Sequence, residues 1–231
     1  MSSPAVLVSG LTVGFHGVPV VRDLDLEVHP GEVVALLGRN GAGKTTTLLT
    51  IAGDLTPQGG SVSVSGDARR RRLHQRARRG LGLLTEERCV FMELTGHENL
   101  RLGRGDPSRA LAFFPELEPH LSKRAGLLSG GQQQMLALAR ILAGRPRVLL
   151  ADELSLGLAP LVVERLLASL RDAAQDGTAV LLVEQHVALA LEAADRAYVL
   201  ADGRIALTDT AANLLTRADD IASAYLGAEA V

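Results

Sequence analysis

The chain has 231 residues, 47% of them hydrophobic, and its formal net charge at pH 7 is −2. A chain of this length buries one sizeable core, or one domain with a small appended lobe. The nearly neutral charge argues against a nucleic-acid-binding protein, and the single cysteine excludes an internal disulfide framework. We expect no secretory signal at residues 1–4 and no membrane-spanning segment, because no run of about 18 apolar residues occurs. Any role at a membrane therefore requires a partner.

The N-terminal part of the chain predicts strands around a glycine-rich segment. Residues 21–29 alternate between apolar and polar side chains, which predicts a half-buried strand. Residues 33–37 are all apolar, which is typical of a strand buried on both faces. After the glycine-rich segment we expect a helix over residues 44–52, and then a third strand over residues 61–65.

The middle of the chain predicts mainly helices. Residues 69–79 contain seven arginines and predict a basic helix, followed by a short strand over residues 81–84. Residues 96–126 are interrupted by three prolines and predict a small helical lobe. A longer helix is predicted over residues 131–143.

The C-terminal part alternates between predicted strands and helices. The predicted elements are strands at 148–151 and 179–183, helices at 161–174 and 187–194, a hairpin at 198–207 turning at Asp202-Gly203, and two short final helices. Such alternation indicates an α/β core with a mostly parallel sheet. The alternating strands near the N-terminus add an antiparallel β patch beside that core.

The glycine-rich segment fits the phosphate-binding pattern G-x-x-x-x-G-K-[ST]. Its residues are Gly38, Arg39, Asn40, Gly41, Ala42, Gly43, Lys44 and Thr45, and Thr46 follows within the predicted helix. Glycines let backbone N–H groups surround phosphate oxygens, and the start of the helix adds about half a positive charge. We expect Lys44 to contact the β- and γ-phosphates and the Thr45 hydroxyl to bind Mg²⁺. The alternative is a glycine-rich surface turn, which the strand-loop-helix setting disfavours. The chain has 22 arginines but only two lysines, and one of these lysines lies at the position where the pattern requires it.

Two carboxylates follow the predicted strand at residues 148–151. Ligands bind at the carboxyl ends of parallel strands, so we expect Asp152 to hold Mg²⁺ and Glu153 to polarise the attacking water. The alternative is an ordinary strand end, which the presence of the phosphate-binding loop makes less attractive.

A second helix start has the features of an anion site. It comprises Leu128, Ser129, Gly130, Gly131 and Gln132, with a serine cap and glycines at the helix N-terminus. One bound nucleotide does not need two anion-binding helix starts from the same chain. The second helix start could therefore complete the nucleotide site of a partner in a head-to-tail pair. A plain N-cap is the alternative.

Together, these motifs resemble the ABC ATPases, because residues 128–132 match the signature of that family letter for letter. The resemblance extends from about residue 5 to residue 227 and implies a P-loop NTPase (RecA-like) fold that binds ATP and Mg²⁺. It implies one domain over 1–231, with a core lobe at about 1–85 and 140–231 and a helical subdomain at about 86–139. It also implies residue roles: Phe15 stacks on adenine, Ser129, Gly130 and Gly131 contact the γ-phosphate bound by the opposite subunit, residues 155–158 link the two sites, and His186 contacts the γ-phosphate.

The sequence departs from the family pattern at several points. Glu86 occupies the position where the family usually has a glutamine; a carboxylate there could still ligate Mg²⁺ or orient water. Leu154 replaces the usual proline after the two carboxylates, and the predicted helical lobe is shorter than usual.

Several strings resemble the ATPases of branched-chain amino-acid importers and of their urea or short-amide relatives. They are Gly130 to Leu136, Ser155 to Pro160, Val183 to His186, Ala224 to Gly227, and Glu86 with Arg88 and Val90-Phe91. This resemblance implies a second ATPase subunit (identical or different), transmembrane permease subunits and, indirectly, an extracytoplasmic substrate-binding protein, with no nucleic acid. It also implies a cytoplasmic location, peripheral on the inner face of the plasma membrane.

Two alternatives stay open: an exporter ATPase of the same fold, and a non-transport ABC protein of DNA repair or translation. Proteins of the second kind usually carry a long coiled-coil insertion or two fused ATPase units, and this chain has neither. For the arginine run at 69–79 we favour a solvated helix face over contact with anionic lipid headgroups, because no aromatic residues are interleaved with it.

Overall fold

A computed structural model describes residues 3–87 and 89–226 of the chain. Arg88 and Gly227, which contribute to the importer-like strings, lie outside these residues. The described part contains no helix that is both long enough and apolar enough to cross a membrane.

The core of the fold is a six-stranded sheet with the order β5-β6-β7-β3-β8-β9. The strands are β5 (Leu81–Leu84), β6 (Val148–Asp152), β7 (Ala179–Glu184), β3 (Val33–Gly38), β8 (Arg196–Ala201) and β9 (Arg204–Thr210). The first five are mutually parallel, and β9 pairs antiparallel with β8. The mostly parallel α/β core predicted from the sequence is therefore confirmed. The hairpin at Asp202-Gly203 is also confirmed, and both residues have positive φ angles, as a tight primed turn requires.

A separate three-stranded antiparallel sheet has the order β2-β1-β4. Its strands are β2 (Val18–Val28), β1 (Val6–Phe15) and β4 (Gly59–Val64), which confirms the predicted antiparallel patch. Strand β1 was not predicted from the sequence. Gly10, with a φ of +56°, lies between Val8 and Leu11, where the register with β2 shifts. This bulge breaks the period-two pattern by which a strand is recognised.

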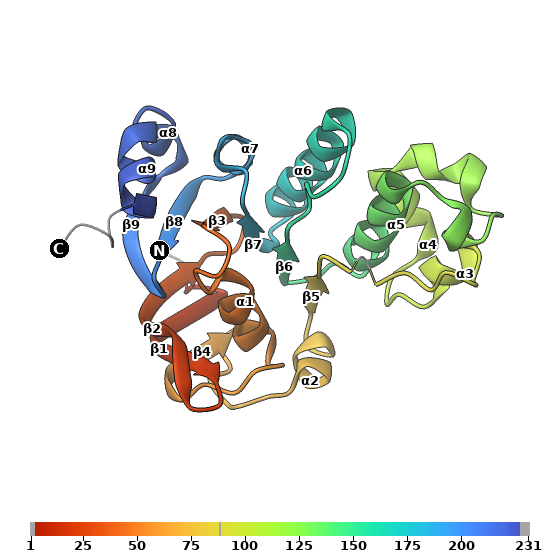
Figure 1. The fold of residues 1–231 in the computed structure, drawn as a ribbon. Coiled ribbons are helices and arrows are strands. Elements are labelled where there is room, and N and C mark those ends of the chain that lie inside the picture. The colour runs from red at the N-terminus through yellow and green to blue at the C-terminus, as the bar shows by residue number, and fades with distance from the viewer. Residues whose placement is uncertain (1–2, 88, 227–231) are drawn as a thin grey trace.

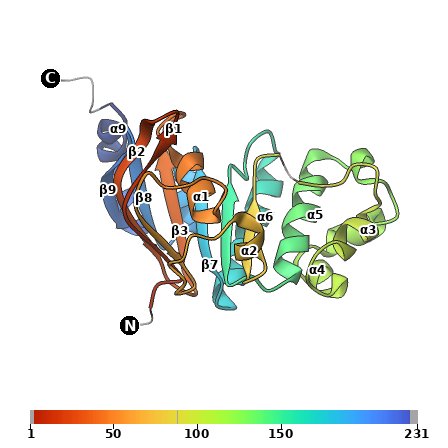
Figure 2. The ribbon, with the colours of Figure 1, turned by 90° about the horizontal axis from the view of Figure 1, so that it is seen from below.

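The helices cover both faces of the large sheet and form a lobe beyond its β5 edge (Figures 1 and 2). They are α1 (Lys44–Ala52), α2 (Leu73–Ala77), α3 (Gly96–Arg101), α4 (Pro107–Phe113), α5 (Gly130–Ala143), α6 (Pro160–Gln175), α7 (Val187–Ala193), α8 (Ala211–Leu215) and α9 (Ala218–Leu226), with 3₁₀ turns η1 (Pro115–His120) and η2 (Ala125–Leu127).

Strand β3 divides the apolar core into two parts. Val34 and Leu36 face one cluster, which contains α1 and the antiparallel sheet. Val33, Ala35 and Leu37 face the other cluster, which contains α6, α7 and the helical lobe. Because β3 is buried on both faces, its sequence is wholly apolar, as predicted.

The prediction of a basic helix over residues 69–79 is wrong for most of that range, because α2 covers only Leu73–Ala77. The first arginines form an extended loop instead. Asp67 binds Arg71 at 2.6 Å and Arg69 at 3.3 Å, and Arg72 has the extended φ and ψ angles of −71° and 157°. The interpretation as a solvated face also fails at Arg76, whose exposed fraction is only 7%.

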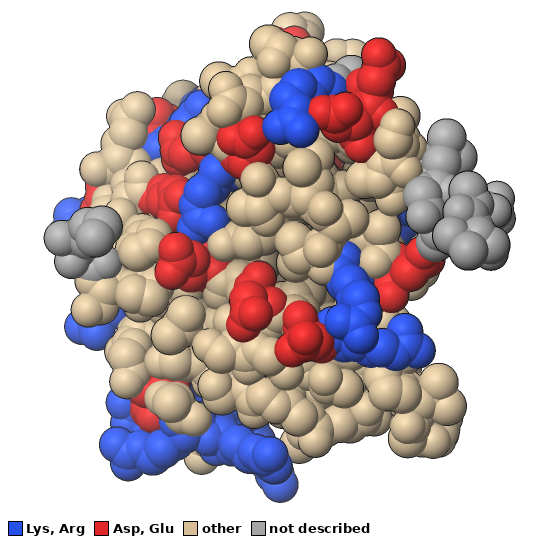
Figure 3. Space-filling view, turned by 90° about the vertical axis from the view of Figure 1, so that its left-hand side faces the viewer, with Lys and Arg blue, Asp and Glu red and all other residues tan. Residues whose placement is uncertain are grey.

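Charged side chains are interspersed on the face that carries the outer strands β2 and β9. Figure 3 shows acidic and basic residues mixed over most of this face, with a basic cluster at its lower edge. Neither sign of charge forms a continuous stripe over this face (Figure 3).

Candidate nucleotide-binding site

The phosphate-binding loop connects β3 to α1, in the setting that the sequence predicts. Gly41 and Gly43 have φ angles of +83° and +107°, which side chains rarely tolerate. A Cβ atom added to Gly38 would lie 2.6 Å from the carbonyl oxygen of Leu200, and one on Gly43 would lie 2.6 Å from Cγ2 of Val21. Packing and backbone conformation thus both require glycine here.

Helix α1 begins with backbone donors that are suited to an anion. Its N-cap, Gly43, has no side chain, and none of the described side chains caps this helix start. The first N–H groups of a helix lack partners within the helix, and its N-terminus carries about half a positive charge. Residues 39–42 also border a cavity of about 210 Å³ beside the turn between β8 and β9.

Lys44 is held against its own loop. The exposed fraction of Lys44 is 4%, and its Nζ donates hydrogen bonds to the carbonyl oxygens of Gly38 at 2.9 Å and Arg39 at 3.2 Å. Burial lowers the pKa of Lys44, and the nearby carboxylates of Glu153, Asp152 and Glu184 oppose that shift. The ammonium group is therefore positioned on the loop that would surround a phosphate.

Asp152 is the most unusual carboxyl group of the site. Its exposed fraction is 4%, and its Oδ1 atom is buried without a hydrogen-bond partner in the described residues. Burial raises the pKa of Asp152 to about 6, a hydrogen bond with Thr45 opposes the shift, and the charges of Glu153 and Glu86 reinforce it. A buried carboxylate oxygen without a partner is costly unless a cation or donor satisfies it.

These residues fit a magnesium ion. The unsatisfied oxygen of Asp152 and the hydroxyl of Thr45 are hard oxygen ligands close to the phosphate-binding loop. No group of three or more His, Cys, Asp or Glu side chains within the described ranges could hold a metal ion by itself. Magnesium typically takes only one or two carboxylates from the protein and completes its shell with phosphate oxygens and water.

The order of the strands brings the other predicted groups to the same edge of the sheet. Glu86 follows β5, Glu153 follows β6, and His186 follows β7, and these three strands lie side by side next to β3. Glu86 and His186 are exposed, whereas Glu153 is partly buried. Glu153 has a φ of +47°, and its N–H donates to the carbonyl oxygen of Val183 at 2.9 Å. This edge therefore gathers two carboxyl groups and one imidazole at the ends of three neighbouring strands.

A buried residue that the sequence analysis did not single out joins two of these loops. Glu184, the last residue of β7, is 2% exposed and accepts two hydrogen bonds from Ser155. In the sequence, Glu184 ends an apolar run and lies within the string from Val183 to His186 that resembles importer ATPases. Leu154, at the position of the usual proline, is 1% exposed and packs in the core.

Phe15 lies at the end of β1 with an exposed fraction of 49%. It pairs with Val18 of β2. In the same strand, the side chains of Val20 and Val21 lie next to Gly43. An exposed aromatic ring thus lies at the end of β1, beside the strand β2 that packs on the phosphate-binding loop. Such a ring is suited to stacking on a base.

The second helix start lies apart from this site. Both ribbon views show α5 with the helical lobe, separated from α1 by other elements (Figures 1 and 2). Ser129 is exposed and forms a capping box in which its Oγ accepts from the N–H of Gln132 at 3.3 Å. A Cβ atom on Gly131 would lie 3.0 Å from Val162 of α6. The structure of one chain thus does not bring residues 129–132 to the phosphate-binding loop.

Comparison with known protein families shows to which family the chain belongs. A family model described as ABC transporter matches residues 21–155, which is more than half of the chain. The chain belongs to the ABC transporter family. As a member of this family it binds ATP and is an ATPase.

Two characterised relatives and one solved structure illustrate the similarity of this ABC ATPase to known proteins. It is 40% identical over 220 residues to the high-affinity branched-chain amino acid transport ATP-binding protein BraG of Pseudomonas aeruginosa, covering 91% of this chain and 94% of BraG. It is 34% identical over 232 residues to the lipopolysaccharide export system ATP-binding protein LptB of Escherichia coli K12, covering 94% and 95%. A solved ATP-binding subunit of an ABC transporter superposes with a TM-score of 0.80 at 30% identity, covering 96% of both chains.

Proposed function

We propose that this ABC ATPase powers the uptake of branched-chain amino acids or of related small polar solutes such as urea and short amides. The proposed transported solute is based on the 40% sequence identity to BraG across nearly the whole of both chains. The geometry that supports ATP hydrolysis is the buried, unsatisfied Asp152 carboxylate beside the phosphate-binding loop.

In the proposed mechanism, each strand end contributes one function. The loop from Gly38 to Thr46 binds the triphosphate, with Lys44 on the β- and γ-phosphates. Thr45 and Asp152 would hold Mg²⁺, with Glu86 as a further candidate ligand; a metal held there would supply positive charge that offsets the negative charge of the phosphates. Glu153 orients and polarises the attacking water, and His186 contacts the γ-phosphate. Phe15 stacks on the adenine.

The active unit that we propose is a head-to-tail pair of ATPase subunits. The separation of Ser129 from the loop of its own chain supports this arrangement, because the signature residues Ser129, Gly130, Gly131 and Gln132 can then face the γ-phosphate bound by the partner. We propose that each copy is a single domain over 1–231. The pair, identical or mixed, acts on permease subunits that receive cargo from an extracytoplasmic binding protein, at the inner face of the plasma membrane.

Export is the second candidate function, and the 34% identity to LptB supports it. The two candidates predict different complexes. An import ATPase purifies with a permease whose ATP turnover rises when a leucine-loaded binding protein is added. An export ATPase purifies with a permease whose turnover does not respond to any such protein.

The experiment that tests the import proposal is leucine uptake by the complex reconstituted in lipid vesicles. We expect ATP-dependent accumulation of radiolabelled leucine with the wild-type chain, and none with Glu153→Gln as a matched inactive control. ATP-dependent loss of a preloaded lipid or lipopolysaccharide from the membrane, without leucine uptake, would contradict import and favour export.

A further inference from the structure

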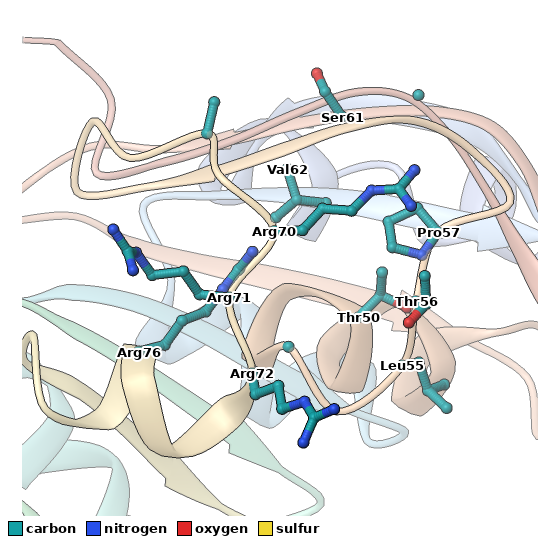
Figure 4. Close-up of a pocket in the computed structure, with 13 residues that line it drawn as sticks. Thr50, Leu55, Thr56, Pro57, Ser61, Val62, Arg70, Arg71, Arg72 and Arg76 are labelled. Atoms are coloured by element: carbon teal, nitrogen blue, oxygen red, sulfur yellow. The ribbon is translucent and has the colours of Figure 1, made fainter.

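A cavity of about 310 Å³ lies at the C-terminal end of α1, between that helix, the start of β4 and the arginine-rich loop (Figure 4). Four of its lining residues are Arg70, Arg71, Arg72 and Arg76, and we call the cavity the arginine pocket. Of the described residues that line it, none is acidic. The proposed ATPase mechanism does not use this cavity.

The arginine pocket is separate from the nucleotide site. The phosphate-binding loop leads into the N-terminus of α1 at Lys44, whereas the pocket is lined by Thr50 near the other end of the helix. Nine residues of α-helix span about 12–14 Å, so the two sites lie at opposite ends of one rigid element. An anion in the pocket would therefore not contact the ATP phosphates.

Arg76 presents a buried cation to the pocket. Its exposed fraction is 7%, and its Nη1 donates to the carbonyl oxygen of Ile51 at the end of α1. No described carboxylate forms an ion pair with it; burial lowers its pKa, and the charge of Asp67 opposes that shift. The C-terminus of α1 supplies about half a negative charge, which offsets only part of one guanidinium. Gly53 permits this approach, because a Cβ atom there would lie 3.2 Å from Nε of Arg76 and 2.2 Å from the Arg71 carbonyl oxygen.

The remaining arginines are not fully neutralised either. Arg71 pairs with Asp67 at 2.6 Å, but Asp67 also pairs with Arg69 and Arg79. Within the described residues, Arg70 and Arg72 form no ion pair, and their side chains reach toward the segment that carries Leu55, Thr56 and Pro57 (Figure 4). Around one cavity there are thus at least two guanidinium groups that form no ion pair within the described ranges, 3–87 and 89–226.

We propose that the arginine pocket binds an anionic group of the phosphate class, carried by a soluble metabolite or by a lipid headgroup. Guanidinium groups donate paired hydrogen bonds that match the oxygens of phosphate. A buried guanidinium such as that of Arg76 has lost hydration, and an anion that binds to it compensates for that loss. The hydroxyls of Thr56 and Ser61 also line the cavity and can donate to the remaining oxygens. The volume of about 310 Å³ leaves room for a phosphate and a small attached group.

The test is calorimetric titration with inorganic phosphate. To silence the nucleotide site, we would use the Lys44→Ala chain and, independently, the wild-type chain saturated with a magnesium-bound non-hydrolysable ATP analogue. We expect one phosphate per chain in both backgrounds, and at least tenfold weaker binding after Arg70→Gln/Arg72→Gln.

The matched control is Arg69→Gln/Arg78→Gln, which removes the same charge from exposed arginines that do not line the cavity. We expect it to change phosphate affinity less than twofold. No binding in either background, or an equal loss in both double variants, would overturn the proposal, since the arginines would then act only through overall charge.

A second arm identifies the source of the anion. Binding to vesicles of phosphatidylglycerol, but not of phosphatidylcholine, that is lost in Arg70→Gln/Arg72→Gln assigns a lipid headgroup. Pocket-dependent binding of glycerol 3-phosphate without vesicle binding assigns a soluble metabolite. Neither substitution touches the nucleotide site, so ATP turnover of the purified chain should stay within twofold of wild type.

Discussion

The hydroxyl of Ser155 donates a hydrogen bond of 2.8 Å to Oε2 of Glu184, and its backbone N–H donates another of 2.9 Å to Oε1. Both residues are buried, with exposed fractions of 8% and 2%. The Glu184 carboxylate therefore fixes the loop that follows Glu153 to the strand that precedes His186. Hydrogen bonds to a charged, buried acceptor are worth about 1.5–3 kcal/mol each, so this connection holds the two loops firmly.

We expect Glu184→Gln to lower kcat for ATP hydrolysis at least tenfold while the ATP Kd changes less than twofold. Glutamine keeps the shape of the glutamate side chain, but it has only one acceptor oxygen and no charge. It therefore cannot accept the two hydrogen bonds from Ser155 on two oxygens as the carboxylate does. Steady-state turnover and equilibrium ATP binding measure the two quantities separately. Gln185→Ala, at the neighbouring exposed position, is the matched control and should leave both unchanged.

Ser155→Thr retains the hydroxyl and should retain most of the turnover, whereas Ser155→Ala should resemble Glu184→Gln. If Glu184→Gln turned over ATP at the wild-type rate, the contact would serve only the stability of the fold.

Lys44→Ala should weaken magnesium-ATP binding at least 100-fold. It removes the ammonium group that lies on the carbonyl oxygens of Gly38 and Arg39 and that would contact the β- and γ-phosphates. Fluorescent nucleotide titration measures the loss. The only other lysine, Lys123, is exposed, and Lys123→Ala should bind normally. Equal affinity in both variants would rule out the proposed role of Lys44.

Glu153→Gln should bind ATP normally but hydrolyse it about 10²–10⁴-fold more slowly, because the amide cannot polarise the attacking water. If the paired arrangement holds, the stalled variant should accumulate as an ATP-dependent dimer on size-exclusion chromatography. Glu164→Gln, on the exposed face of α6, is the matched control and should remain monomeric and active. Wild-type turnover in Glu153→Gln would remove Glu153 from the mechanism.

Asp152→Asn should stabilise the nucleotide-free chain at pH 7.5 while abolishing its stabilisation by magnesium-ATP. The pKa of Asp152 is about 6 in the folded chain and 3.8 in the unfolded one, so the charged form is disfavoured by folding. This penalty is fully present above pH 6 and disappears as the pH falls toward 4. From the pKa difference it amounts to up to about 3 kcal/mol.

Thermal unfolding at pH 7.5 and pH 5 measures the effect of this substitution. We expect Asp152→Asn to unfold at a higher temperature than wild type at pH 7.5, with a smaller difference at pH 5. Asp176→Asn, at an exposed position, is the control for removing one carboxylate and should leave the stabilisation by magnesium-ATP intact. A variant less stable than wild type at pH 7.5 would mean that the Asp152 carboxylate is already satisfied without the metal.

Local sequence patterns were enough to predict the α/β class, the strand and helix on either side of the phosphate-binding loop, and most candidate site residues. These depend on local patterns: an apolar run for a strand buried on both faces, glycines at positive φ, and a lysine and threonine at fixed spacing. Where a local pattern was interrupted, the prediction failed. The bulge at Gly10 concealed β1, and the pairing of Asp67 with Arg69 and Arg71 holds an extended loop where the residue pattern favoured a helix.

Which residues lie close together depends on the folding of the whole chain. The order β5-β6-β7-β3 places Glu86, Asp152 and Glu184 near one another although long stretches of chain separate them. Strand order and burial are set by the packing of the whole chain. No local pattern therefore predicts that Ser155 donates hydrogen bonds to Glu184, or that Arg76 is buried beside a cavity. Both features arise because a charged group in the interior is satisfied by groups close to it in space but distant in sequence, Ser155 for Glu184 and the carbonyl oxygen of Ile51 for Arg76.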